Sequence, residues 1–132
     1  HTTAYVSKAR AKNFKIAAPY VIDTDAANAG KMVRSPLEKT DENMQSAGGI
    51  FMSVSDLGRW LNVNMNSGKL GNKQVFDADL IRNAHTGYTK STRNEPPFSG
   101  DGEYGLGWQI GKYRNENVIY HHGGYPGYRS HV

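Results

Sequence analysis

The sequence contains no cysteine, which excludes disulfide bonds and thiolate metal sites. No apolar run approaches the roughly 18 residues that a membrane-spanning helix needs, so we expect no membrane span in this segment. Large apolar side chains are also scarce, because Leu, Ile, Val and Phe make up only 24 of the 132 residues. That share lies just below the roughly 20 % at which a chain becomes too polar for a packed core. We therefore interpret the chain as a polar folded domain, or as part of a larger one that supplies further apolar surface.

The positive charge is not concentrated in one place, although the net charge is +4. The closest basic cluster comprises Lys8, Arg10, Lys12 and Lys15. It has no base-stacking motif and no helix-turn-helix pattern around it. A solvated face explains these residues better than a nucleic-acid interface, so we expect no nucleic-acid partner.

Two helices are predicted from their capping residues and apolar spacing. Ser53 followed by Asp56 is a capping pattern, and the apolar residues after it recur on one face. We expect this helix to bury Trp60 in a core. A second, shorter helix is expected to start at Asp77, and His85 at its end is interpreted as a helix cap rather than a catalyst.

The second half of the chain predicts antiparallel strands. Residues 86–102 lack periodicity and are expected to form a long loop. Residues 104–111 alternate bulky and small side chains, which predicts a strand, and the polar turn at 114–117 pairs it with a strand at 118–120. Residues 128–132 begin another strand. Together with the helices, these patterns predict an α+β fold in which helices flank an antiparallel sheet.

The stretch His121-His122-Gly123-Gly124 carries the chemistry that stands out most in this sequence. The two histidines are neighbours on a strand, point to opposite faces and cannot hold one metal ion together. The two glycines are open to two interpretations. They form a turn, or they leave a strand edge bare so that backbone N–H groups can bind an oxyanion beside a substrate acyl group.

A nucleophile for such an oxyanion is missing from these residues. None of the nine serines has a lysine three residues later, so no Ser-x-x-Lys pair exists in which the lysine could take the serine proton. No Gly-x-Ser-x-Gly motif occurs either. Tyr113-Arg114-Asn115 has the spacing of a Tyr-x-Asn motif, but it falls in the predicted turn, and we interpret it as coincidence.

Three stretches, taken in order, resemble the C-terminal portion of the serine β-lactamase-like family. They are SAGGIFMSVSDLGRW (46–60), EYGLGW (103–108) and VIYHHGGYPGYRS (118–130). The family includes class C β-lactamases, D-alanyl-D-alanine carboxypeptidases, D-aminopeptidases and related esterases. The resemblance implies a partial β-lactamase/transpeptidase-like fold over residues 1–132. It also implies that the nucleophile motif, the final strand and the final helix of the family lie outside this segment.

The resemblance assigns roles to individual residues. His121 would point into the cleft and join the proton network, while Gly124 would supply one oxyanion donor through its N–H group. Substrate contacts would come from Gly123, Tyr125 and the loop around Gly48. No cofactor and no metal is implied.

The implied activity is that of a serine hydrolase that forms an acyl-enzyme with an amide or ester substrate. The substrate would be a β-lactam, a D-amino-acid peptide or an ester, and this segment alone would be inactive. The alternative is a non-catalytic module that binds peptide or glycan on the same scaffold. Exposed sheet edges would favour self-association. By resemblance, the protein would be periplasmic or secreted.

Overall fold

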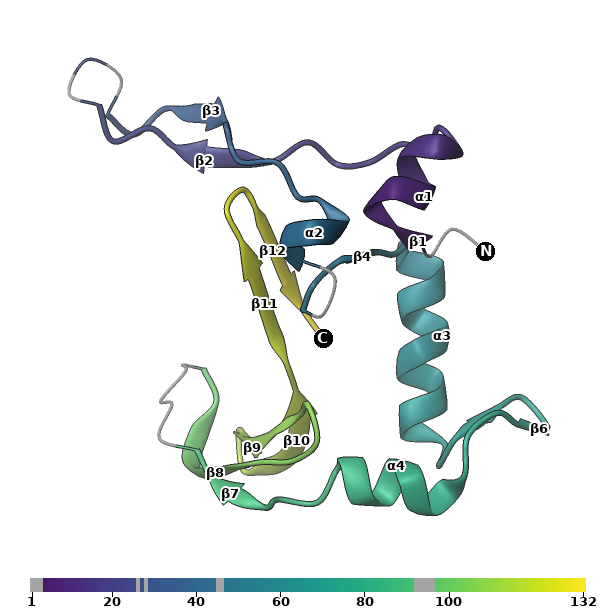
Figure 1. The fold of residues 1–132 in the computed structure, drawn as a ribbon. Coiled ribbons are helices and arrows are strands. Elements are labelled where there is room, and N and C mark those ends of the chain that lie inside the picture. The colour runs from purple at the N-terminus through teal and green to yellow at the C-terminus, as the bar shows by residue number, and fades with distance from the viewer. Residues whose placement is uncertain (1–3, 26, 28, 45–46, 92–96) are drawn as a thin grey trace. The chain divides into compact units, whose positions relative to one another are not determined.

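The computed structural model describes residues 4–25, 27, 29–44, 47–91 and 97–132. The chain forms two compact units, and Figure 1 shows the elements of both. The first unit contains residues 1–57 and 122–130, and the second contains residues 58–121 and 131–132. Helices and antiparallel strands are mixed in the chain, which confirms the predicted α+β fold class.

The first unit is built from short elements. Its helices are α1 (Val6–Ala11), α2 (Asp41–Met44) and the first turn of α3 (Val54–Met65). Its strands are β1 (Ala4–Tyr5), β2 (Tyr20–Ile22), β3 (Met32–Arg34), β4 (Ile50–Phe51), β11 (His122–Tyr125) and most of β12 (Tyr128–His131). The strands form three antiparallel pairs, β1 with β4, β2 with β3, and β11 with β12.

The turn between β11 and β12 depends on Gly127. Pro126 followed by Gly127 at φ +85° is typical of a type II turn, in which only glycine adopts the second conformation without strain. A side chain at Gly127 would lie 2.8 Å from the backbone nitrogen of Tyr20, which itself donates a hydrogen bond to the Gly127 carbonyl at 3.3 Å. Residue 127 therefore has both a conformational and a steric reason to be glycine.

The second unit contains a four-stranded antiparallel sheet in the order β10-β9-β8-β7. The strands are β7 (Thr89–Lys90), β8 (Ser99–Tyr104), β9 (Gln109–Tyr113) and β10 (Glu116–Tyr120). The rest of α3, the two-residue strands β5 (Lys69–Leu70) and β6 (Lys73–Gln74), and α4 (Ala78–Ala84) precede the sheet in the chain. Arg114 and Asn115 both have positive φ, as a type I′ turn requires, and they join β9 to β10. The Tyr-x-Asn spacing thus lies in a hairpin turn.

Both predicted helices form with the capping contacts expected of them. The Ser53 hydroxyl accepts a hydrogen bond from the Asp56 N–H at 3.2 Å, at the start of α3. The Asp77 side chain accepts one from the Asp79 N–H at 2.7 Å, at the start of α4. Local sequence signals were sufficient for these helices because a cap and its partner lie within three residues.

Trp60 does not occupy a buried core position, contrary to the prediction. It is 37 % exposed, and its ring meets the edge of Phe76 at a centroid distance of 6.0 Å. The buried apolar residue of α3 is instead Val63. The helical spacing located the helix correctly but did not determine how deeply each side chain on that face is covered.

The predicted strand at 104–111 is interrupted. Strand β8 ends at Tyr104 and β9 begins at Gln109, because the residues between them form a turn. Gly107 has φ +85°, and a side chain on Gly105 would lie 2.5 Å from the carbonyl oxygen of Ala84 at the end of α4. The alternating glycines therefore serve a turn and a close backbone approach, rather than one face of a continuous strand.

The predicted loop at 86–102 contains strands where the structure describes it. Strand β7 and most of β8 lie within this range and pair with each other. Residues 92–96 lie outside the described residues. Sequence periodicity missed these strands because β7 has only two residues and β8 is rich in glycine and polar side chains.

In the described part of the chain, no helix is both long enough and apolar enough to cross a membrane. The same residues contain no group of three or more His, Asp or Glu side chains placed to hold a metal ion.

Candidate functional site

His121 is held at the end of β10 and contacts a tyrosine. Its backbone exchanges both hydrogen bonds with Val132, at 3.0 and 3.1 Å. Its Nε2 atom lies 3.2 Å from the hydroxyl of Tyr104, the last residue of β8. A ring nitrogen and a phenol hydroxyl at this distance form one hydrogen bond, and the tautomer of the ring decides which group donates. The alternating pattern of the sequence indicates a strand at Tyr104 but gives no sign of this pairing.

The backbone of Gly124 faces away from the neighbouring strand. His121 and Val132 exchange both of their hydrogen bonds, and such pairs alternate with non-bonded pairs along an antiparallel ladder. By this alternation Gly123 lies in a bonded pair opposite Ser130, and Gly124 lies in a non-bonded pair opposite Arg129. The N–H of Gly124 is therefore directed to the side of β11 that β12 does not cover, as an oxyanion donor requires.

Backbone crowding does not require glycine at positions 123 and 124 of β11. A side chain at Gly124 would meet the Nη1 atom of Arg129 at 2.5 Å, and one at Gly123 would meet the hydroxyl of Ser130. Both neighbours are the ends of rotatable side chains and can move aside. The missing side chains at 123 and 124 would point to opposite faces of the strand, and packing does not require glycine at either position.

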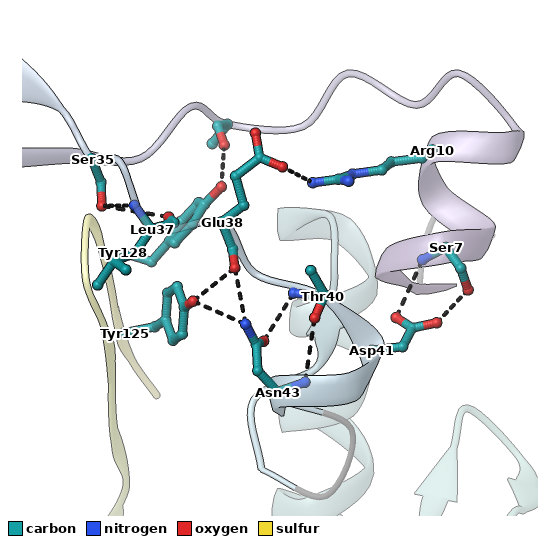
Figure 2. A network of polar contacts seen from close by, with 11 residues as sticks. Ser7, Arg10, Ser35, Leu37, Glu38, Thr40, Asp41, Asn43, Tyr125 and Tyr128 are labelled. Atoms are coloured by element: carbon teal, nitrogen blue, oxygen red, sulfur yellow. Dashed lines mark hydrogen bonds and ion pairs between the residues drawn. The ribbon is translucent and has the colours of Figure 1, made fainter.

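Tyr125 and Gly48, two further predicted substrate contacts, lie in the first unit. Figure 2 shows the surroundings of Tyr125. The Tyr125 hydroxyl donates to the carbonyl of Glu38 at 2.8 Å and accepts from the Asn43 side-chain amide at 3.4 Å. The structure therefore gives this hydroxyl two partners within the chain, so the predicted substrate contact of Tyr125 would have to come from its ring. Gly48 has φ +78°, while Ser46 of the same predicted loop lies outside the described residues.

Lys39 contacts both of these residues and was not among the predicted site residues. Its Nζ atom donates to the Gly48 carbonyl at 2.6 Å. The same atom lies 5.2, 5.6 and 5.2 Å from the ring centroids of Phe51, Tyr125 and Tyr128, respectively. Burial lowers the pKa of Lys39 from its ordinary value. No local pattern signals this cluster, because its members are far apart in the sequence.

A polar network surrounds α2 and fixes the segment that carries Lys39 (Figure 2). Thr40 and Asn43 exchange hydrogen bonds, with the Thr40 N–H donating to the Asn43 side chain at 2.9 Å and the Asn43 N–H donating to the Thr40 hydroxyl at 3.3 Å. Asp41 accepts from the hydroxyl of Ser7 and, at 3.2 Å, from its N–H. The hydroxyl contact is the main reason that the pKa of Asp41 is lowered.

A separate cavity of about 740 Å³ lies in the second unit, with His85 on its wall. The backbone N–H of His85 donates to the Ile81 carbonyl at 3.1 Å, so its predicted position as a helix cap is confirmed. Its Nε2 atom lies 3.1 Å from the Asn64 side-chain oxygen, and its ring meets Trp108 edge-on at 5.5 Å. Burial lowers the pKa of His85, which favours the neutral ring over a charged cap.

The fold matches that of a penicillin-binding protein homologue. The solved structure of the octameric penicillin-binding protein homologue from Pyrococcus abyssi aligns with this chain at a TM-score of 0.78 and 20 % sequence identity. The match covers 99 % of this chain and 26 % of that one, so the chain spans about a quarter of its length. A search of curated proteins finds no match.

The model of the beta-lactamase family matches residues 3–132. This chain therefore belongs to the beta-lactamase family, and the resemblance inferred from the three sequence stretches is confirmed. The roles assigned to His121, Gly123, Gly124, Tyr125 and Gly48 remain predictions, which the geometry above makes specific enough to test.

Proposed function

We propose that this chain forms one wall of the active site of a serine hydrolase that acts on amide or ester bonds through an acyl-enzyme. The observation that carries the proposal is the outward-facing N–H of Gly124, three residues after an imidazole paired with a phenol. Membership of the beta-lactamase family supports the reaction class. The substrate class is a β-lactam, a D-amino-acid peptide or an ester.

The proposed reaction uses groups of this chain together with a serine that lies outside it. The serine oxygen attacks the substrate carbonyl carbon, and the serine proton passes to a base and then to the leaving group. The carbonyl oxygen becomes an oxyanion, which the Gly124 N–H stabilises together with the N–H of the serine. Water then adds to the acyl group and releases it. The His121 imidazole, paired with the Tyr104 hydroxyl, takes part in the proton network.

The serine and its lysine would come from sequence outside these 132 residues. None of the nine serines here has a lysine three positions later, and the chain covers only 26 % of its structural match. On this proposal the 132-residue chain alone does not turn over substrate. The alternative, a non-catalytic module that binds peptide or glycan on this scaffold, is favoured by the same lack of a Ser-x-x-Lys pair.

Covalent trapping distinguishes the two functions. The 132-residue chain and the longer protein that contains it are each incubated with a fluorescent penicillin and with p-nitrophenyl acetate, and intact masses are recorded. We expect an acyl adduct on one serine of the longer protein and none on the 132-residue chain. If the longer protein has no Ser-x-x-Lys pair and forms no adduct, but binds peptide or glycan, the hydrolase proposal is wrong. An acylated serine within the 132 residues would contradict the assignment of the nucleophile.

We also propose that copies of the chain associate and that the protein acts in the periplasm or outside the cell. The outer strands of the four-stranded sheet, β7 and β10, supply edges that can pair, and the structural match is described as octameric. Sedimentation of the chain is expected to show species larger than a monomer, and a single monomeric species would refute the association. Cell fractionation tests the compartment, and a purely cytoplasmic protein would refute that part.

A further inference from the structure

We propose that Lys39 is a positioning residue whose ammonium group holds the Gly48 turn and the Tyr125 ring in fixed places. It thereby sets the shape of the wall that these residues present to substrate. The substrate part of this inference rests on the proposed function. The positioning itself concerns only residues of the first unit and can be tested without any activity.

The first contact of the ammonium group is with the backbone of the turn. Lys39 Nζ donates to the Gly48 carbonyl at 2.6 Å, and a charged donor makes roughly twice as strong a hydrogen bond as a neutral one. Gly48 is held in the left-handed region at φ +78°, where a side chain would lie 2.9 Å from the Cε atom of Met44. The turn therefore lies close to α2, and the ammonium group sets the direction of its carbonyl.

The second set of contacts is with three aromatic rings from two distant segments. Phe51 belongs to β4, whereas Tyr125 and Tyr128 flank the turn of the β11–β12 hairpin. All three ring centroids lie within 6 Å of Nζ, the range in which cation–π attraction acts. The rings also touch each other, Phe51 edge-on to Tyr128 at 5.9 Å and Tyr125 to Tyr128 at 6.4 Å. One charge thus joins β4, the Gly48 turn and the hairpin.

The charge of Lys39, rather than its aliphatic stem, accounts for this geometry. The carboxylate of the preceding residue, Glu38, pairs with Arg10 at 3.0 Å. A cavity of about 280 Å³ beside the cluster is lined by these two residues, by Arg34, and by Lys39 itself. Burial lowers the pKa of Lys39 and so opposes the charged form, whereas the carbonyl and the rings favour it. A neutral side chain of the same length would fill the space but would lose both kinds of contact.

The positioning is tested by amide hydrogen exchange and by the tyrosine ring resonances of the 132-residue chain. Lys39→Met keeps the length of the side chain and removes the charge, Lys39→Arg keeps the charge, and Lys8→Met alters an exposed lysine of the same unit. We expect Lys39→Met to accelerate exchange at Ile50 and Phe51 at least about fivefold and to shift the Tyr125 ring signals. Lys39→Arg should stay within about twofold of wild type, because guanidinium also binds aromatic faces, and Lys8→Met should have no effect.

The substrate part is tested by steady-state kinetics of the serine-containing protein. Lys39→Met should raise KM about five- to tenfold and change kcat by less than about twofold, because the wall contacts ground state and transition state alike. Lys39→Arg should recover most of the loss. If Lys39→Met fails to fold, Phe51→Leu removes one ring at similar volume and should give the same changes at smaller amplitude.

Each outcome has one meaning. Unchanged exchange and ring signals in Lys39→Met overturn the positioning role. Altered exchange with an unchanged KM overturns the link to substrate. A wild-type protein with neither turnover nor acylation refutes the proposed hydrolase function instead, while the exchange data still decide whether Lys39 positions the turn and the hairpin.

Discussion

The two units of the chain are held together in different ways. The second unit buries large side chains, and among its described residues Trp108 and Tyr120 are 7 % and 8 % exposed. The buried apolar residues described in the first unit are small or medium in size: Ala4, Val6 and Ala9. The stabilisation from a core is roughly proportional to the apolar area that it buries. The core of the first unit therefore stabilises it less than the core of the second unit does.

The first unit relies instead on directional contacts. Tyr125, Asn43 and Glu38 form one group of hydrogen bonds around α2 (Figure 2). The ammonium group of Lys39 adds a charged hydrogen bond to the Gly48 carbonyl. Such contacts fix positions more sharply than apolar packing, but each depends on a single polar group. Four of the five predicted site residues lie in this unit, so the proposed chemistry depends on the polar part of the molecule.

The largest stability effect is expected from the core of the second unit. Trp108→Ala removes a buried aromatic side chain that packs against His85, and should lower the free energy of unfolding by about 3–5 kcal/mol. Chemical denaturation followed by circular dichroism measures this change. The control Leu106→Ala alters a 60 % exposed residue and should stay within about 0.5 kcal/mol of wild type. Equal losses in the two variants would contradict the assignment of the core.

A smaller effect is expected from the polar network of the first unit. Asn43→Ala removes a side chain that accepts a hydrogen bond from the Thr40 N–H and donates one to the Glu38 carbonyl. This change should lower the free energy of unfolding by about 1 kcal/mol. Denaturation of this variant is compared with Asn117→Ala, an exposed position on β10, for which we expect no more than about 0.5 kcal/mol. If both asparagine variants behave alike, the network does not stabilise the first unit.

The smallest effect is a difference in the pH at which each unit loses stability. Burial lowers the pKa of His85, so as the pH falls below about 6.5 the unfolded chain binds a proton before the folded second unit does, and stability decreases. The pKa of Asp41 is lowered from 3.8, so its contribution to the first unit is present above that value and is lost as the pH falls through the lower folded value.

Thermal unfolding followed by residue-resolved NMR at several pH values separates these two losses. We expect signals of the second unit to lose stability as the pH falls below about 6.5, and those of the first unit only as the pH falls below about 3.8. His85→Gln should flatten the first dependence and Asp41→Asn the second. A loss in the second unit that persists in His85→Gln would refute the role of His85.

The sequence predicted the features that depend on neighbours in the chain. Ser53 and Asp77 located the two helices, and the polar turn at Arg114 and Asn115 located a hairpin, because each cap or turn acts over two to four residues. The alternation after Tyr104 predicts one continuous strand, and this prediction is wrong because the same glycines that suit a strand face also permit the turn between β8 and β9.

Contacts between distant residues could not be predicted in this way. Lys39 meets rings at 51, 125 and 128, and Tyr104 meets His121, but no short motif links these positions. The bare strand at Gly123 and Gly124 was recognised as a candidate oxyanion site. The outward direction of the Gly124 N–H required the ladder that His121 and Val132 establish.

The direct test of the account is the kcat of the serine-containing protein with Gly124→Pro and with Gly124→Ala. Proline removes the N–H, whereas alanine keeps it and meets only the movable end of Arg129. If Gly124 is an oxyanion donor, Gly124→Pro should lower kcat about 100- to 1000-fold, and Gly124→Ala should stay within about threefold of wild type. A Gly124→Pro protein that folds and retains the kcat of Gly124→Ala would contradict the account.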